Sequence, residues 1–199
     1  MIFTNKFLLF LTLLLLSGCN VFTYTPLFPV FKNAIFGVED FEITDEYIAS
    51  REYSFMKVKI GRSSIAIFVL LKIDEDNNFH WVNADQETIV TNQGKIIEIF
   101  GLLKGNFKYS SIDKRAFPDW DDQASLIYLA EFVDPRAFFT FESLIENQYS
   151  NSTILEHVNV KSLKWEFTNR YEYKKGLAYY SEQRVHPHLP KLTINYYYK

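Results

Sequence analysis

The clearest periodicity of the sequence lies in residues 163–174, where apolar and polar side chains alternate. One set of alternating positions is apolar or aromatic apart from a single amide: Leu163, Trp165, Phe167, Asn169, Tyr171 and Tyr173. The other set is charged apart from one threonine: Lys164, Glu166, Thr168, Arg170, Glu172 and Lys174. Because successive side chains of a β-strand point to opposite faces of the sheet, this pattern predicts a strand with one buried face and one solvent-facing side.

Shorter runs of the same kind fill the middle of the chain. Residues 53–60 alternate, and residues 65–73 are apolar on both faces, which is typical of a central buried strand. The other runs of this block are residues 79–84, 87–91 and 95–100. Turn sequences such as Asn92-Gln93-Gly94 separate them. Residues 47–101 therefore predict an antiparallel meander.

A second block of strand-like runs follows an irregular, aspartate-rich segment at residues 113–122. Its members are residues 126–133, 138–145, 154–160, 177–184 and 192–198, and Lys175-Gly176 is the predicted turn into residues 177–184. About ten short runs with short turns predict a mostly β fold with a single antiparallel β domain, either a curved sandwich or a partly closed barrel. A transmembrane barrel is the rival interpretation. Residues 65–73 and 126–133 argue against it, since a pore-lining strand has a polar lumen face.

One or two short helices are predicted before the first strand. Residues 29–37 begin with a proline, which suits a first helical turn, and end with a glycine, which suits the position after the last turn. Thr44-Asp45-Glu46 predicts the capped start of a further single turn that contains Tyr47 and Ile48.

The first eighteen residues have the features of an export signal. Lys6 is their only charged side chain, and the apolar run over residues 7–16 is too short to span a bilayer. Leu16-Ser17-Gly18-Cys19 then has the form of a lipobox, in which small residues precede a cysteine that carries a diacylglyceryl group. Cys19 is the sole cysteine, so an internal disulfide is excluded.

These features predict three segments. Residues 1–18 form a lipoprotein signal peptide, residues 19–28 contain the acylated Cys19 and a short tether, and residues 29–199 form the single β-rich domain. Acyl chains such as palmitate would hold the chain at the membrane without a basic patch. Asn20, rather than an aspartate, follows Cys19, and by the sorting rule of enteric-type bacteria this resembles a lipoprotein sent to the outer membrane.

The charge balance and the motifs argue against several function classes. The formal net charge of −3 argues against nucleic acid as a partner. A nucleophile elbow and a phosphate-binding glycine loop are both missing, and no carboxylate pair is singled out for glycoside cleavage. The sequence therefore predicts a protein that is not an enzyme and has no cofactor.

Two groups of residues deserve comparison with metal sites. His186 and His188 are the one close histidine pair, but metal sites usually require a third ligand, so we interpret the pair as part of a surface loop. Asp119, Asp121 and Asp122 lack the spaced oxygen ligands of a calcium loop and are interpreted as a solvated acidic segment. The sequence therefore predicts no metal site.

Aromatic residues make up 18% of the chain, a share that needs an explanation. We interpret most of them as the filling of a large core or barrel interior. The alternative is that some line an apolar cavity for a lipid, or stack on sugar rings at the surface. Tyr196, Tyr197 and Tyr198 are the first candidates for such a ligand contact, because at least one of them must face the solvent side of its strand.

Residues 47–102 also carry a set of short motifs. They are Tyr47-Ile48-Ala49-Ser50, Gly61, Val69-Leu70-Leu71, Trp81-Val82-Asn83-Ala84-Asp85, Ile89-Val90-Thr91, Gly94-Lys95-Ile96 and Gly101-Leu102. The C-terminal part adds Trp165, Asn169, Tyr171, Gly176, Gln183 and Pro187. Together with the lipobox, these residues resemble the GfcB/YjbF family of capsule and exopolysaccharide lipoproteins. Asn83 and Lys95 depart from the family pattern, which has Ser and Arg there.

The resemblance implies a pathway more than a mechanism. It implies a lipid-anchored, periplasm-facing lipoprotein of the outer membrane of a Gram-negative bacterium, produced with components of polysaccharide secretion. Its expected role is that of a non-enzymatic accessory factor in capsule or exopolysaccharide production or export, which acts by contact with envelope proteins of the export system. The alternative is a lipid- or glycan-binding, barrel-like module at the outer membrane.

Overall fold

The computed structural model describes residues 42–63, 65–102, 105–111, 123–133, 136–148 and 152–199. They fall within one compact unit of the chain, Glu39–Lys199. The predicted signal peptide, Cys19, the tether and the helix over residues 29–37 lie outside the described residues, as does the acidic segment around Asp119. None of the described helices is long and apolar enough to cross a membrane.

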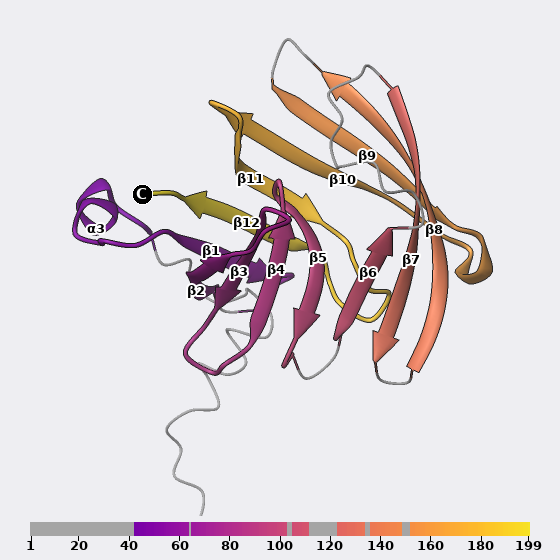
Figure 1. Cartoon of the computed structure of the whole chain (residues 1–199), viewed down its shortest axis with the longest axis horizontal. Helices are drawn as coiled ribbons and strands as arrows, with labels where there is room; N and C mark the ends of the chain where they lie inside the picture. Colours follow the sequence, from indigo (N-terminus) through magenta and orange to yellow (C-terminus); the bar gives the residue numbers. More distant parts are fainter. Residues whose placement is uncertain (1–41, 64, 103–104, 112–122, 134–135, 149–151) are drawn as a thin grey trace, which may run out of the picture. The chain divides into compact units, whose positions relative to one another are not determined.

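The described residues form one closed antiparallel sheet (Figure 1). Its strands are β1 (Phe55–Ile60), β2 (Ile65–Ile73), β3 (Asn78–Val82), β4 (Thr88–Asn92), β5 (Lys95–Phe100), β6 (Phe107–Ser111), β7 (Gln123–Val133), β8 (Arg136–Gln148), β9 (Thr153–Val160), β10 (Trp165–Lys174), β11 (Leu177–Gln183) and β12 (Leu192–Tyr197). Each strand pairs with its neighbours in the sequence, and β1 also pairs with β12, with Val58 opposite Ile194. The predicted β fold is thus confirmed as a barrel.

Tight turns with left-handed backbone join the hairpins where the sequence predicts them. Gln93 and Gly94 connect β4 to β5 with φ values of 46° and 87°. Lys175 and Gly176 connect β10 to β11 with φ values of 54° and 80°. Two consecutive residues with positive φ are typical of the type I′ turn, whose twist matches that of the flanking strands. These turns set the pairing of the adjoining residues, and the register shifts farther along, between Val90 and Thr91 in β4 and between Glu172 and Tyr173 in β10.

The interior of the barrel is filled by side chains. Its largest fully buried members include Trp81, Tyr171, Phe68, Phe107 and Phe141. The alternation predicted for β10 is confirmed, because Asn169, Tyr171 and Tyr173 are buried whereas Arg170 is exposed. This packed interior differs from the polar lumen that the transmembrane interpretation required.

The prediction that two strands are buried on both faces was wrong. In β2, Phe68 is buried, but Leu71 and Ile73 are 68% and 50% exposed, beyond a register shift between Leu70 and Lys72. In β7, Ile127 is 43% exposed. The physical reason is that a closed sheet has a single interior, so every second residue faces outward unless another element covers it.

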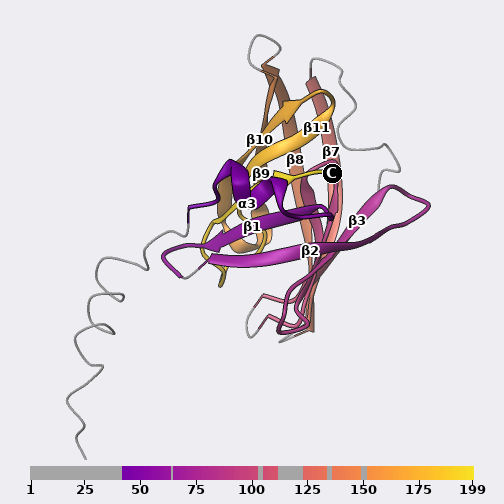
Figure 2. The ribbon, with the colours of Figure 1, turned by 90° about the vertical axis from the view of Figure 1, so that its left-hand side faces the viewer.

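A single helical turn, α3 (Asp45–Ala49), precedes β1, as predicted. Thr44 caps it: its side-chain oxygen accepts a hydrogen bond from the backbone N–H of Tyr47 at 3.1 Å. The Tyr47 ring contacts Phe55 edge-on, with 5.8 Å between centroids. Figure 2 shows α3 beside β1, so this turn covers an outward-facing aromatic residue of the barrel wall.

The β4–β5 turn gives a test of this packing. A Cβ atom on Gly94 would lie 2.4 Å from the Cβ of Ala178, whereas one on Gly176 would meet nothing within 4 Å. Both glycines have positive φ, so alanine is strained at either position. We expect Gly94→Ala to lower the free energy of unfolding by about 1–3 kcal/mol more than the matched control Gly176→Ala. Urea denaturation of the two full-length variants measures this, and equal losses would contradict the described contact.

Candidate functional site

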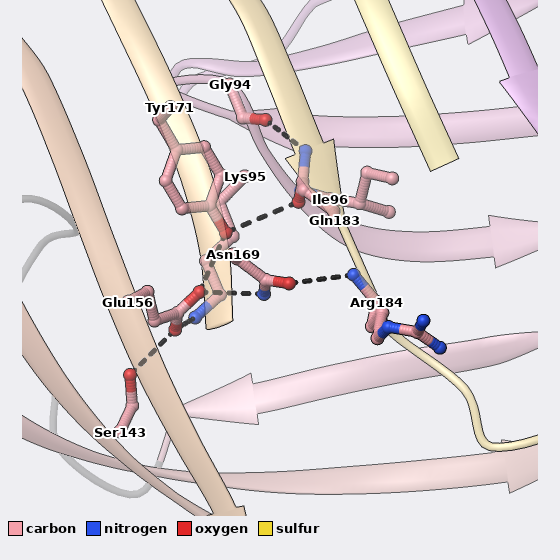
Figure 3. Close-up of polar contacts among 9 residues, drawn as sticks. All are labelled: Gly94, Lys95, Ile96, Ser143, Glu156, Asn169, Tyr171, Gln183 and Arg184. Carbon is pink, nitrogen blue, oxygen red and sulfur yellow. Dashed lines mark hydrogen bonds and ion pairs between the residues drawn. The ribbon is translucent and has the colours of Figure 1, made fainter. Parts of the chain in front are cut away.

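The barrel interior contains an ion pair between Lys95 of β5 and Glu156 of β9 (Figure 3). The two side chains are 4% and 1% exposed. The Lys95 ammonium contacts Oε1 of Glu156, and Ser143 Oγ donates to the same oxygen at 2.7 Å. Asn169 Nδ2 and Tyr171 Oη donate to Oε2 at 3.1 and 2.7 Å. The carboxylate thus accepts from four donors, two on each oxygen.

Two tyrosine rings also face the ammonium. The Lys95 Nζ lies 3.6 Å from the centroid of the Tyr128 ring and 5.5 Å from that of Tyr109. The negative face of an aromatic ring attracts a cation, and the attraction is stronger where water is excluded. One carboxylate and two rings therefore compensate the charge of Lys95.

The hydrogen bonds continue from this pair across the barrel. Gln183 of β11 accepts from the backbone N–H of Ile96 at 2.9 Å and donates to the carbonyl of Gly94 at 2.8 Å. The hydroxyl of Tyr196 donates to the same carbonyl at 2.9 Å. On the opposite side, Asn169 accepts from the backbone N–H of Arg184 at 2.7 Å. The bonds of Gln183 and Tyr196 connect the start of β5 to β11 and β12, with which β5 shares no sheet pairing.

The environment lowers the pKa of both members of the pair. For Lys95 the largest cause is burial, which the Glu156 carboxylate opposes. Burial alone would raise the pKa of Glu156, but the Lys95 ammonium and the hydrogen bonds from Lys95, Tyr171 and Ser143 outweigh it and lower that pKa. Burial raises the pKa of Tyr171 well above its usual value, and the Glu156 charge adds to this. Glu156 is therefore ionised and fully hydrogen-bonded, so it is unsuited to act as a general base. Lys95, Glu156 and their hydrogen-bond partners therefore have a structural role in the barrel interior.

A pocket of about 330 Å³ lies at one end of the barrel. The segment between β11 and β12 forms part of it: Val185 and His186 are buried, and Leu189 packs against the core. The 3₁₀ turn η3 (Lys161–Leu163) and Trp165 at the start of β10 form another part. The pocket is lined by Phe132, Ala137, Phe139, Leu163, Lys164, Trp165, His186, Pro187 and His188.

The interpretation of the histidine pair as a surface loop was wrong for one of its members. His186 is 3% exposed, and its ring centroid lies 4.3 Å from that of Phe132. Burial, with a smaller contribution from His188, lowers the pKa of His186 to about 4. His188 itself is exposed. Among the described residues, no group of three His, Cys, Asp or Glu side chains is placed to hold a metal ion.

Tyr196, Tyr197 and Tyr198 are buried or half-buried, whereas a contact with a ligand at the surface needs exposed rings. Tyr196 is 4% exposed, and its ring lies parallel to that of Tyr198 with 6.1 Å between centroids. Both rings pack near Trp81 inside the barrel. Tyr197 points to the other face and stacks on Phe55 at 4.8 Å. We therefore assign all three to packing.

A wider depression of about 590 Å³ lies over β7 to β10. Its polar side chains are largely paired with one another or with near neighbours. Lys161 donates to Glu142 at 2.8 Å, Asn159 donates to Glu166 at 3.0 Å, and His157 Nδ1 lies 3.0 Å from Thr168 Oγ1. This surface offers fewer free groups to a ligand than the end pocket does.

The sequence reasoning missed Lys95 and Glu156 as interior residues. The signal was present for Glu156, because Ile154, Glu156, Val158 and Val160 occupy the same inward-facing positions of β9. A carboxylate in an apolar alternation predicts a buried partner. For Lys95 there was no comparable signal, since it directly follows a turn.

Comparisons with known proteins agree on one family and one fold. The family model "Group 4 capsule polysaccharide lipoprotein gfcB, YjbF" matches residues 29–124. The uncharacterized lipoprotein YjbF of Escherichia coli strain K12 is 31% identical over 98 residues, which are 49% of this chain and 44% of that protein. The crystal structure of the hypothetical lipoprotein YmcC from Escherichia coli K12 superposes with a TM-score of 0.58 at 15% identity and shows the same fold. That match covers 85% of this chain and 94% of the other.

Replacing Lys95 tests the buried pair. We expect Lys95→Met to lower the free energy of unfolding by about 3–5 kcal/mol at pH 7, because it leaves the Glu156 carboxylate buried without its cation. In the wild type, the lowered pKa of Glu156 adds stability above the unfolded-state value of roughly 4.3, and this is lost on acidification. In the Lys95→Met variant, burial raises the pKa of Glu156. The difference in the free energy of unfolding between wild type and variant therefore shrinks as the pH falls from 7 to about 4.

The matched control is Lys108→Met, because Lys108 pairs with Glu98 at 3.4 Å but is 61% exposed. It should cost less than about 1 kcal/mol at each pH. Urea denaturation at several pH values measures both variants. A similar, pH-independent loss in the two would show that the Lys95–Glu156 pair does not have the environment described above.

Proposed function

We propose that this chain, which belongs to the YjbF family of group 4 capsule lipoproteins, is a non-enzymatic accessory lipoprotein in capsule or exopolysaccharide production or export. The observation that carries the proposal is the family match over residues 29–124, which includes the Trp81 to Gly94 motifs. The fold shared with a second lipoprotein of Escherichia coli agrees with it. Because the curated relative is matched over less than half of its length, its own role comes to this chain only as part of this proposal.

The chemistry of the described residues favours an accessory role over catalysis. The most strongly buried charges, Lys95 and Glu156, are engaged with each other and with fixed hydrogen-bond donors. A catalytic acid or base needs a proton to exchange with a substrate, and therefore access to it. The interior that holds these groups is packed with aromatic and aliphatic side chains.

The proposed location is the periplasmic face of the outer membrane, with Cys19 as the anchor. The lipobox and Asn20 support this placement. Contact with envelope proteins is supported by apolar side chains on the outer barrel wall. Val133 of β7 and Phe138 of β8 are 52% and 53% exposed, and they flank the same hairpin. Exposed apolar groups on neighbouring strands are a common feature of protein contact surfaces.

The second candidate function is a lipid- or glycan-binding module. The described interior supports only part of it, since the aromatic rings that an enclosed lipid cavity would need for its walls instead pack against one another. The end pocket beside Trp165 and His186 is the feature that favours a bound ligand.

Complementation in the native bacterium tests the leading proposal. We expect deletion of the gene to lower the amount of cell-surface polysaccharide and the wild-type gene to restore it. Cys19→Ser should fail to restore it and should incorporate no radiolabelled palmitate, because the thiol that accepts the lipid is missing. Polysaccharide is measured by uronic-acid assay of washed cells.

The control is Ser17→Ala, which keeps a small residue in the lipobox and should be lipidated and active. Pull-down of the wild-type protein from detergent extract should recover an envelope protein of the export system. Unchanged polysaccharide in the deletion strain would overturn the proposed pathway. Palmitate on the Cys19→Ser protein would overturn the assigned anchor.

A further inference from the structure

The end pocket combines aromatic walls with a polar group that the fold leaves unused. We infer that it binds a sugar residue that carries a carboxylate, as a uronic acid does. The inference rests on the proposed function, and it names the ligand class and the place where that ligand would be held. The aromatic walls, the His186 side chain and the charge of the rim support it.

The walls of the pocket suit the apolar face of a sugar ring. Phe132 and Phe139 lie 5.1 Å apart between ring centroids, and Trp165 is half-buried beside Phe167 at 4.2 Å. The volume of about 330 Å³ is at the small end of ligand pockets, which matches one or two sugar rings better than a long chain. Rigid aromatic side chains lose little conformational entropy when they bind, so they make efficient walls.

His186 supplies a directed hydrogen-bond donor. Its Nδ1 accepts from the backbone N–H of His188 at 3.1 Å, so Nδ1 carries no proton. A neutral imidazole must then carry its proton on Nε2. His186 is 97% buried and lines the pocket, and no described residue accepts a hydrogen bond from its Nε2. The Nε2 atom is open to the pocket rather than sealed in the interior, so a ligand oxygen can accept a hydrogen bond from it.

The rim adds a positive charge. Lys164 lies at the pocket edge as the C-cap of η3, with a left-handed backbone at φ 48°. It is exposed, and no described residue pairs with its ammonium. Among the described residues that line the pocket there is no aspartate or glutamate, whereas two histidines and this lysine are present. A carboxylate is the charge that complements such a rim.

The same features argue against a fatty acyl chain as the occupant. A hydrocarbon chain would fill the aromatic walls but would leave the His186 Nε2–H without an acceptor in a drier environment. A sugar offers several hydroxyl acceptors beside its apolar face, and its carboxylate can reach the Lys164 side of the pocket. The unused donor therefore decides between the two ligand classes.

Titration by NMR of the full-length protein in lipid nanodiscs tests the inference, with empty nanodiscs as a blank. The probes are D-glucuronate, D-glucose and octanoate. We expect glucuronate to perturb the Trp165 indole and the His186 Nε2 resonances, and to bind more tightly than glucose. His186→Phe, which keeps the ring but lacks the donor, should weaken glucuronate about tenfold. Lys164→Gln should weaken glucuronate about threefold and leave glucose unchanged.

Matched controls are Lys175→Gln, a lysine with φ 54° in the β10–β11 turn, and His157→Phe on the barrel wall. Neither should change binding. The inference would be overturned if octanoate perturbed these resonances and glucuronate did not. It would also be overturned if neither pocket variant weakened glucuronate binding. If His186→Phe does not fold, the test rests on two measurements: the shift of the wild-type His186 Nε2 resonance with glucuronate, and the affinity of Lys164→Gln for glucuronate. If cells with the pocket variants make the full amount of polysaccharide, the proposed accessory role still stands. If the deletion strain makes the normal amount, the proposed accessory role itself fails.

Discussion

Closure of the sheet is the constraint on which the rest of this structure depends. When β1 pairs with β12, the sheet acquires a single interior, and side chains from strands that are distant in sequence must fill it. The Lys95–Glu156 pair is formed in this way, because it joins β5 to β9 across that interior. Leaving either charge alone there would be costly, so the pair and its hydrogen bonds favour one arrangement of the opposite walls.

The filled interior decides where the protein can interact with other molecules. The aromatic residues that a lipid-binding barrel would place around a cavity here pack against Trp81, Tyr171 and their neighbours. Recognition is therefore left to the outer wall and to the barrel ends. At one end, the segment between β11 and β12 carries His186 into a buried position and leaves a small aromatic pocket beside it. The inferred sugar site is therefore placed at a barrel end by the same packing.

The sequence predicted local features well because short-range physics sets them. Alternation identified the inward face of β10, turn chemistry identified the Gly94 and Gly176 hairpins, and Thr44 marked the start of α3. Contacts between distant strands were not predictable from one sequence. The partner of Lys95 lies 61 residues away, and His186 is buried only because the loop that carries it packs across the barrel end. Burial of both faces of β2 was wrongly predicted, since an apolar run alone does not show whether its outer face is covered.

The most direct test of the central claim is a ¹³C NMR titration of the Glu156 side-chain carboxyl in the folded protein. The buried cation and its neighbouring donors should hold the midpoint below the ordinary value of 4.5, so the carboxyl resonance should not move between pH 7 and pH 5. A midpoint above 4.5 would show that burial outweighs the lysine, and that Lys95 and Glu156 do not form the ionised pair on which this account of the barrel rests.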